Sequence, residues 1–364
     1  MSQQKVAIVH DWLIGGGAEK VIEALHQMYP EAPIYTSYAS QEWRDKLDNR
    51  VVTGYLQHWP FSRLRKFIPI LRIWWFQSLD FSNYDVVISS SGAEAKGIKT
   101  SKPTFHINYC HAPTHYYWNR YDDYLHNPGF GVFNPLARLG LRLLVGPLRK
   151  WDYKAAQRPD AIIANSSFTQ KQIKQYYNRD STVIFPPVAI EKFKPKTNNV
   201  RAGFVIAGRQ TPYKRFDLAV LACSELDLPL LVIGSGPDHD KLKKMAGSSI
   251  SFKPWVSDDD IVKAFQSAEG FIFPGTDDFG IVAVEALAAG CPVIAYKDGG
   301  TLDYITPGRT GEFFEKQTSA SLADTLKIFR PSEFKQASIV ASAEKFNTRT
   351  FMSHIQSYLA AQRT

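Results

Sequence analysis

Short apolar runs alternate with amphipathic stretches along the whole chain, a pattern typical of parallel strands joined by helices. In the first half the runs are Lys5–His10, Asp85–Ser91, Thr104–His111, Asp160–Ser166 and Thr182–Phe185. The second half contains Gly203–Ala207, Leu228–Ile233, Ile250–Val256, Gly270–Phe273 and Pro292–Tyr296. Each series predicts an open, doubly wound α/β sheet.

The passage Pro186–Thr197, rich in proline and lysine, indicates a linker between the two series. A length of 364 residues also favours two domains over one core. We therefore expect one Rossmann-like domain over residues 1–188 and a second over residues 189–345, facing each other across a cleft. A long last helix, about Ser332–Ala361, is expected to break near Asn347. Its part in residues 346–364 is a candidate for crossing back to the first domain.

The net charge of +8 lies almost entirely in the first half of the chain. Residues 1–190 hold 22 Lys and Arg against 15 Asp and Glu, a net of +7, and the remainder holds 21 against 20. This excess favours an anionic partner for the first domain, which could be nucleic acid, anionic lipid or a phosphorylated substrate.

The chain shows no signal-peptide pattern at its N-terminus and no run of about 18 apolar residues. Its three cysteines, Cys110, Cys223 and Cys291, are far apart and lack metal-ligand spacing. These features lead us to expect a cytoplasmic protein with reduced cysteines.

The passage Phe273–Pro292 (FPGTDDFGIVAVEALAAGCP) joins a strand end, a polar loop and an apolar helix. Glu285 stands among apolar neighbours in this helix, so its burial would be costly unless donors meet its carboxylate. Gly280 would let a ligand approach the backbone, and the helix N-terminus favours anions. The passage therefore predicts a phosphate-binding site beside two carboxylates, those of Asp277 in the loop and Glu285 in the helix.

Three more loops follow predicted strands and carry suitable chemistry. Gly15, Gly16 and Gly17 follow the first strand and form either a phosphate loop or a plain tight turn, without the GxGxxG dinucleotide pattern. Arg209 and Lys214 follow another strand and suit a diphosphate, the alternative being surface cations. Trp255 and Val256 could form a wall for a base. The acidic run 258–260 predicts a first helical turn rather than a metal site.

Taken together, these passages resemble the retaining glycosyltransferases of family 4 (GT4), which have the GT-B fold, and among them GDP-mannose-dependent mannosyltransferases. The resemblance spans essentially the whole chain through VHDWLIGGGAEKV, YCHAPTHYYW, AGRQTPYK, IGSGPD and PGTDDFGIVAVEALAAGCPVIA. The family's acidic signature, two Glu separated by seven residues, maps onto Asp277 and Glu285. Asp at the first position departs from the family's usual Glu by one methylene.

The resemblance implies roles for the matching residues. The donor phosphates would be met by Gly15, Gly16, Gly17, Arg209, Lys214, Ile281 and Val282. The transferred sugar would be held by Asp277 with the backbone of Phe279 and Gly280, and Glu285 would accept hydrogen bonds from the ribose hydroxyls. The catalytic candidates are His111, Asp277, Arg209 and Lys214. The class generally needs no metal or other cofactor.

Two residues of the first domain are candidates for the acceptor side. His111 matches the family's active-site histidine and would contact sugar or acceptor, the alternative being a core histidine. Asp11 would either touch the acceptor or cap the glycine loop.

Two windows, residues 49–79 and 124–151, contain basic, aromatic and leucine residues and no acid. Such composition suits the surface of an anionic membrane. The alternatives are nucleic-acid binding, for which no motif is present, and a core helix with a cationic solvent face. The membrane candidates are Arg63, Arg65, Lys66, Arg72, Trp74 and Trp75.

The resulting hypothesis is a retaining hexosyltransferase that moves mannose from GDP-mannose to a lipid-linked or cell-surface glycan acceptor. It would act at the inner face of the cell membrane as a peripheral protein and would not bind nucleic acid. The alternatives are a nucleotide-sugar epimerase of the same fold and a non-catalytic binder of nucleotide sugars or polyanions.

Overall fold

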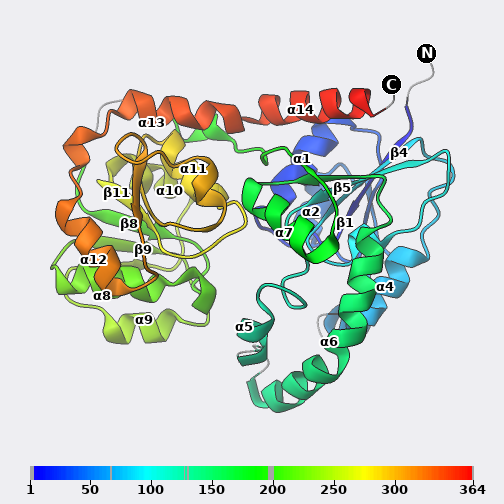
Figure 1. The fold of residues 1–364 in the computed structure, drawn as a ribbon, viewed down its shortest axis with the longest axis horizontal. Coiled ribbons are helices and arrows are strands. Elements are labelled where there is room, and N and C mark those ends of the chain that lie inside the picture. The colour runs from blue at the N-terminus through cyan, green and yellow to red at the C-terminus, as the bar shows by residue number, and fades with distance from the viewer. Residues whose placement is uncertain (1–3, 66–67, 127, 129–130, 196–200, 363–364) are drawn as a thin grey trace. The chain divides into compact units, whose positions relative to one another are not determined.

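The structure, a computed structural model, describes residues 4–65, 68–126, 128, 131–195 and 201–362. The chain forms two compact units, each built on one parallel sheet (Figure 1). Unit 1 comprises Met1–Pro186 and Phe351–Thr364, and unit 2 comprises Pro187–Thr350.

The sheet of unit 1 has seven strands in the order β3-β2-β1-β4-β5-β6-β7. Their bounds are β1 Val6–His10, β2 Ile34–Thr36, β3 Val51–Val52, β4 Val86–Ser91, β5 Phe105–Cys110, β6 Ala161–Ala164 and β7 Thr182–Val183. The strand order reverses between β1 and β4, which pair in parallel with Ile8 opposite Ile88. In such sheets ligands bind beyond the carboxyl ends of the strands at this reversal.

The helices of unit 1 connect these strands. They are α1 Glu19–Met28, α2 Gln41–Lys46, α3 Phe61–Leu64, α4 Pro69–Gln77, α5 Tyr121–His126, α6 Asn134–Ala156 and α7 Ser167–Tyr177. The last helix, α14 Thr348–Ala361, packs Phe351, Ile355 and Leu359 into the core of unit 1. The chain therefore returns to its first unit at its C-terminal end.

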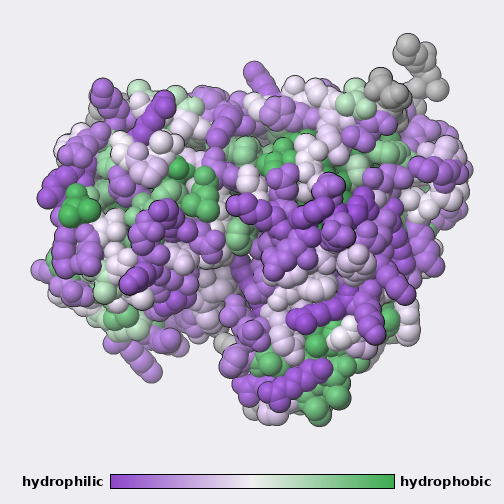
Figure 2. Space-filling model, in the orientation of Figure 1, coloured by the Kyte–Doolittle hydropathy of each residue, from purple (hydrophilic) through white to green (hydrophobic). Residues whose placement is uncertain are grey.

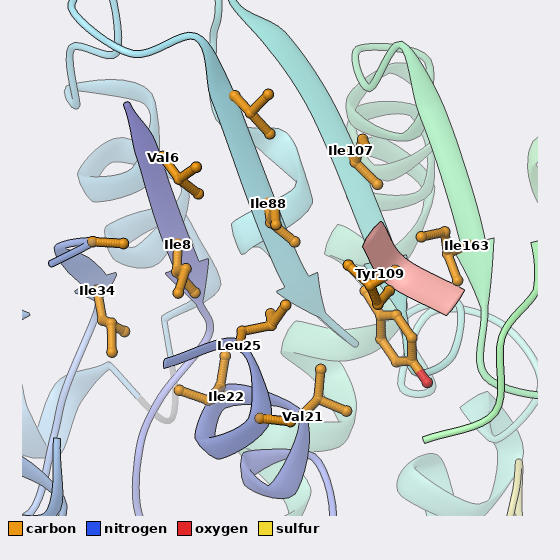
Figure 3. Packing of buried hydrophobic residues seen from close by; sticks show 14 of the residues in the cluster. Val6, Ile8, Val21, Ile22, Leu25, Ile34, Ile88, Ile107, Tyr109 and Ile163 are labelled. Atoms are coloured by element: carbon orange, nitrogen blue, oxygen red, sulfur yellow. The ribbon is translucent and has the colours of Figure 1, made fainter. Parts of the chain in front are cut away.

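The core of unit 1 is formed where α1 lies against the sheet (Figure 3). Val21, Ile22 and Leu25 of α1 point toward Ile8 of β1 and Ile88 of β4, and all five side chains are buried. A buried leucine or isoleucine contributes roughly 1.5–3 kcal/mol relative to leaving it exposed. This packing holds the first strand and the helix after the glycine loop in one rigid body.

Unit 2 repeats the doubly wound arrangement with six strands in the order β10-β9-β8-β11-β12-β13. Their bounds are β8 Phe204–Ala207, β9 Leu230–Ile233, β10 Ile250–Lys253, β11 Gly270–Phe273, β12 Val293–Tyr296 and β13 Gly311–Phe314. The helices are α8 Phe216–Glu225, α9 His239–Met245, α10 Asp258–Ser267, α11 Ile281–Ala288, α12 Ser319–Ile328 and α13 Gln336–Ala343. Here the order reverses between β8 and β11.

Every strand predicted from an apolar run is present, but three strands were missed. β2 and β3 have three and two residues, and β13 has the mixed sequence Gly-Glu-Phe-Phe. Such short or mixed segments carry no apolar run, so the alternation rule cannot detect them. The acidic turn was predicted correctly: Ser257 caps α10 by accepting a hydrogen bond from the Asp260 amide, and Asp258–Asp260 form the first turn.

The membrane candidates of the first basic window divide into exposed and buried residues, which corrects the sequence interpretation. Arg65 and Arg72 are each only 5 % exposed. Trp75 is half-buried, and its indole donates to the carbonyl of Thr36 and packs against Gly54. Arg63 and Trp74 are exposed, and Lys66 lies outside the described residues. Hydropathy cannot show which side of a short helix faces the core.

Among the residues that the structure describes, no helix is long and apolar enough to cross a membrane.

One buried histidine of the core gives unit 1 a defined pH dependence. His106 of β5 is fully buried, and its Nε2 lies 2.8 Å from the Ser89 hydroxyl. Burial lowers the pKa of His106 to about 3, opposed by the carboxylate of Asp160. The unfolded chain binds a proton near pH 6.5, whereas the folded chain does so only near pH 3.

We therefore predict that the free energy of unfolding falls as the pH decreases from 6.5, by up to about 1.4 kcal/mol per pH unit from this group. His106→Gln should reduce that slope, whatever its effect on absolute stability. Urea unfolding followed by tryptophan fluorescence between pH 4.5 and 7.5 measures it. His354→Gln, at an exposed position of α14, is the control. Equal slopes for His106→Gln and wild type would contradict the prediction.

Candidate functional site

The reversal point of unit 2 brings together the loops after β8 and β11, which contain most of the predicted donor-binding residues. Residues 208–215 follow β8, and residues 274–280 follow β11, the neighbouring parallel strand. A Cβ atom at Gly275 would lie 2.9 Å from the Cα of Lys214. The two loops are thus in backbone contact, which requires glycine at that position.

Further glycines pack neighbouring loops against this pair. A Cβ at Gly234, after β9, would lie 2.1 Å from the carbonyl oxygen of Gly208, and Gly234 has a φ of +109°. A Cβ at Gly300, after β12, would lie 2.4 Å from the carbonyl oxygen of Asp278, and the Gly300 amide donates to the backbone carbonyl of Asp277 over 2.8 Å. The loops at the carboxyl edge therefore form one interlocked backbone surface.

Lys214 and Asp277 form an ion pair across the two loops. Their side chains are 20 % and 14 % exposed, so both reach the surface of the unit. The sequence interpretation assigned Lys214 to phosphate and Asp277 to sugar without connecting them. Arg209, in the same β8 loop, is exposed. Two cations and one carboxylate thus occupy the reversal point.

Tyr304 supports the turn that leads from Asp277 into α11. Its hydroxyl donates to the carbonyls of Phe279 and Gly280 over 2.8 and 3.2 Å. Burial, and then the charges of Asp277 and Asp303, hold the pKa of Tyr304 well above its usual range. The phenol therefore remains a donor and fixes the loop. Nothing in its sequence context indicated this role.

Helix α11 presents its start and one side to the surface of unit 2. Gly280 precedes it with a φ of +83°, and the first amides of a helix have no acceptor within the helix. Ile281, Val282 and Glu285 are half-buried, whereas Ala283, Val284, Ala286 and Leu287 are buried. Glu285 is therefore not the deeply buried carboxylate that its apolar neighbours predicted. It lies on the open side of α11, one turn beyond the helix start.

Gln210 is a residue of this region that the sequence analysis missed. It is fully buried, donates to the carbonyl of Gly234 over 2.6 Å and lies 2.8 Å from the Nδ1 of His239. It thereby ties the β8 loop to the β9 loop and the start of α9. Because Gln210 stands between Arg209 and Lys214 in the sequence, nothing in its local sequence indicates that it is buried.

Trp255 and Val256 lie in the loop between β10 and α10, near the edge of the sheet. Trp255 is 86 % exposed and Val256 is half-buried. An indole so exposed is available to stack on a flat ring.

The reversal point of unit 1 is organised by Asp11, directly after β1. Its carboxylate accepts hydrogen bonds from the amides of Gly92, Ala93 and Ala95 over 2.8–3.0 Å and from the Ser91 hydroxyl. Asp11 is 4 % exposed, and burial raises its pKa. Asp11 thus caps the turn after β4, whereas the sequence suggested a cap on the glycine loop or contact with an acceptor.

The glycine loop is held by another carboxylate, Glu19 of α1. Glu19 accepts from the amides of Ile14 and Gly15 over 3.3 and 3.0 Å, and it is 4 % exposed. Gly15 has a φ of +105°, which favours glycine. Gly15, Gly16 and Gly17 are exposed. Glu19 therefore fixes the start of the loop from its buried side, while the three glycines remain exposed to solvent.

His111 lies at the end of β5, half-buried, beside the same turn. Its Nε2 lies 2.7 Å from the Ser90 hydroxyl, and a Cβ at Gly92 would lie 3.7 Å from the His111 Cβ. His10, buried at the end of β1, donates from Nδ1 to the Ser90 carbonyl over 2.7 Å. The two imidazole centroids are 6.2 Å apart. The sequence analysis gave His10 no role, yet it shares Ser90 with His111.

Among the described residues, no group of three or more His, Cys, Asp or Glu is arranged to hold a metal ion. The three cysteines are buried. Each predicted site residue is thus placed within its own unit: the glycine loop, Asp11 and His111 in unit 1, and the remaining donor candidates in unit 2.

Comparison with solved structures identifies the fold. HepE from Anabaena in complex with UDP-glucose matches with a TM-score of 0.71 at 17 % identity, covering 99 % of this chain and 100 % of that one. Sucrose-phosphate synthase from Thermosynechococcus elongatus matches with a TM-score of 0.69 at 16 % identity, covering 99 % of each chain.

Curated relatives match at lower coverage. A D-inositol 3-phosphate glycosyltransferase of Streptomyces avermitilis is 28 % identical over 47 % of this chain and 44 % of its own length. A phosphatidyl-myo-inositol mannosyltransferase of Mycobacterium leprae is 28 % identical over 56 % of this chain and 53 % of its own. The chain spans about half the length of the curated relatives it matches.

Two family models cover nearly the whole chain without a gap between them. The model described as Glycosyltransferase Family 4 matches residues 15–192, and the model described as Glycosyl transferases group 1 matches residues 187–346. The chain therefore belongs to glycosyltransferase family 4 and has the GT-B fold, with two Rossmann-like domains.

Proposed function

We propose that the chain is a retaining hexosyltransferase that transfers mannose from GDP-mannose to a lipid-linked or cell-surface glycan acceptor. The observation that carries this proposal is the reversal point of unit 2, where Lys214, Asp277 and the start of α11 meet. A nucleotide sugar needs these groups: cations and helix amides for the diphosphate, and a carboxylate for sugar hydroxyls. HepE, a structural neighbour, is described in complex with UDP-glucose, which supports a nucleotide-sugar donor.

In the proposed reaction the bond between the sugar C1 and the diphosphate oxygen breaks as the acceptor oxygen bonds to C1 on the same face. The acceptor proton passes to the departing diphosphate, and the products are a nucleoside diphosphate and a glycoside. Arg209 and Lys214 stabilise the charge that develops on the leaving diphosphate, so the proposal requires no metal ion. His111 contacts the sugar or the acceptor from unit 1.

The ion pair between Lys214 and Asp277 suggests how donor binding begins. A diphosphate would compete with Asp277 for the ammonium of Lys214, because both are anions. Asp277 would then be released to accept hydrogen bonds from the hexose. Glu285, one turn into α11 and half-buried, would accept from the ribose. If the diphosphate displaces Asp277 from Lys214 before the sugar is bound, the shorter Asp side chain is compatible with sugar binding.

A panel of nucleotide sugars tests the donor. We predict that GDP-mannose raises the melting temperature most, by roughly 5 °C at a hundredfold excess over its Kd, since a ligand that binds the folded state stabilises it by mass action. Differential scanning fluorimetry with GDP-mannose, UDP-glucose and UDP-N-acetylglucosamine measures the shift. A larger shift with a UDP-sugar would contradict the choice of donor. Conversion of the donor without an acceptor would indicate an epimerase instead.

The division of roles between the two carboxylates makes a second prediction. Asp277→Ala should reduce transfer at least a hundredfold and leave GDP affinity within threefold of wild type, since Lys214 stays available to phosphate. Glu285→Ala should weaken GDP binding at least tenfold, about 1.4 kcal/mol. Calorimetry and a transfer assay measure the two quantities. Asp324→Ala, 76 % exposed on α12, is the control. Equal losses of GDP affinity in both variants would refute this division.

We also propose that unit 1 attaches to the anionic inner face of the cell membrane, where a lipid-linked acceptor is available. Leu136, Leu139, Leu143 and Leu144 of α6 are 53–68 % exposed. Figure 2 shows apolar residues gathered over this part of the molecule, at the bottom of the view. Arg142 and Lys150 on the same helix are exposed. Leucines beside cations suit the boundary between headgroups and acyl chains.

Flotation with anionic liposomes tests this attachment. Leu139→Glu with Leu143→Glu should lower the bound fraction at least tenfold, because it removes apolar area and adds negative charge. The matched control is Leu302→Glu with Ile328→Glu, two exposed apolar residues of unit 2. Binding should also weaken as salt is raised. Absence of wild-type flotation at low salt would contradict the proposal.

A further inference from the structure

We propose that Arg65 forms an anion-binding site in unit 1 that receives a phosphoryl group. Arg65 directly follows α3 and is 5 % exposed, an unusual state for a guanidinium. Its position, its surroundings and the absence of a carboxylate partner among the described residues support the proposal independently.

The site lies at the carboxyl edge of β1 and β2. The Arg65 guanidinium carbon is 4.0 Å from the centroid of the Tyr38 ring, and Tyr38 follows β2 by two residues. The Tyr38 carbonyl accepts from the amide of Leu13 over 2.8 Å. Arg65 therefore packs on Tyr38, which contacts the segment between β1 and the glycine loop. This is the edge where ligands of such sheets bind.

A second arginine, Arg72 of α4, completes the cluster. Its guanidinium lies 5.6 Å from the Trp12 ring centroid, and its Nη1 donates to the Arg65 carbonyl. Trp12 and Tyr38 are both half-buried, so the two rings give the cluster partly open walls. Side chains from four separate segments thus converge next to the glycine loop.

The two arginines differ in their counter-charges. Arg72 forms a bidentate pair with the fully buried Glu94, with two distances of 2.8 Å, and also donates to the Tyr116 hydroxyl. Arg65 has no carboxylate partner within ion-pair distance among the described residues, and its buried Nε has no hydrogen-bond acceptor there. One positive charge at this edge therefore remains unbalanced.

An unbalanced buried cation is unfavourable for the folded chain alone. Burial lowers the pKa of Arg65, and the charge of Arg72 lowers it further, while Tyr38 opposes both. An anion entering from outside would supply the missing charge and an acceptor for Nε–H. A guanidinium fork matches two oxygens of a phosphate, and the amides of the exposed Gly16 and Gly17, in the loop that follows Trp12, would serve further oxygens, which favours a phosphoryl group over a single carboxylate.

This site refines the acceptor class: the acceptor would carry a phosphate or diphosphate close to the hydroxyl that is glycosylated. Anion binding by Arg65 is independent of the reaction, whereas identification of the anion as the acceptor rests on the proposed function. Lipid-linked diphosphates and soluble sugar phosphates share this chemistry, so experiments must separate them.

Binding of inorganic pyrophosphate tests the site directly. The full chain with Arg209→Ala and Lys214→Ala, which removes the cations of unit 2, serves as the background for calorimetry. Adding Arg65→Gln should weaken pyrophosphate binding at least tenfold, and Arg63→Gln, an exposed arginine of α3, should change it less than twofold. No pyrophosphate binding in the background chain, or equal binding with and without Arg65, would overturn the proposal.

Thermal unfolding separates a ligand-binding arginine from a structural one. Arg65→Gln removes an unbalanced charge and should leave the melting temperature unchanged or raise it. Arg72→Gln leaves Glu94 buried without its partner and should lower the melting temperature by several degrees. A loss for Arg65→Gln as large as that for Arg72→Gln would make Arg65 structural and refute the site.

Transfer assays then distinguish the sources of the phosphoryl group. Arg65→Gln should raise KM at least tenfold for the acceptor that wild type uses, either a lipid-linked diphosphate sugar in vesicles or a soluble sugar phosphate, and leave the donor KM unchanged. Pyrophosphate binding through Arg65 without any transfer would refute the proposed function and retain the site. Transfer that is unaffected by Arg65→Gln would retain the proposed function and refute the identification of the bound anion as the acceptor.

Discussion

Backbone-to-backbone contact between loops is the constraint on which the rest of unit 2 depends. Gly234 meets the Gly208 carbonyl, Gly275 meets Lys214, and Gly300 meets Asp278, at distances that exclude any side chain. Because these loops leave different strands, their contact places functional groups from separate parts of the sequence within reach of one another. Lys214 and Asp277 can pair only because Gly275 allows the β11 loop to approach the β8 loop. Buried polar groups, Gln210 and Tyr304, then lock the same loops.

In unit 1 the corresponding loops are held together by a buried carboxylate and by ion pairs, and not by glycine packing. Its strand order reverses between β1 and β4, as that of unit 2 does between β8 and β11. At this point one carboxylate, Asp11, collects three amides of the turn after β4. Two later residues of the same turn form ion pairs with helices: Glu94 binds Arg72 of α4, and Lys96 binds Asp152 of α6 at 2.6 Å. The turn after β4 thereby connects the end of β1 with two surface helices.

Such buried ion pairs contribute little net stability, because desolvation offsets most of the attraction. Their value is positional, since each charge accepts few geometries in a dry environment. Arg65 differs from the neighbouring buried cations: among the described residues it lacks a carboxylate partner, whereas Arg72 and Lys96 each have one. An external anion would give Arg65 the counter-charge that Glu94 and Asp152 give to Arg72 and Lys96.

The sequence by itself determined the two-sheet architecture, the general alternation of strands and helices, the capped start of α10 and the strand-end location of the candidate residues. These follow from local rules, namely apolar runs, glycine positions and first-turn acids. Only the tertiary structure decided which of these residues meet. It paired Lys214 with Asp277 and placed Glu285 on an open side of α11. It also buried Arg65 and Arg72, left Trp75 half-buried, and directed the Asp11 carboxylate to the turn after β4. Burial and pairing depend on contacts between segments far apart in sequence, and no local pattern encodes those contacts.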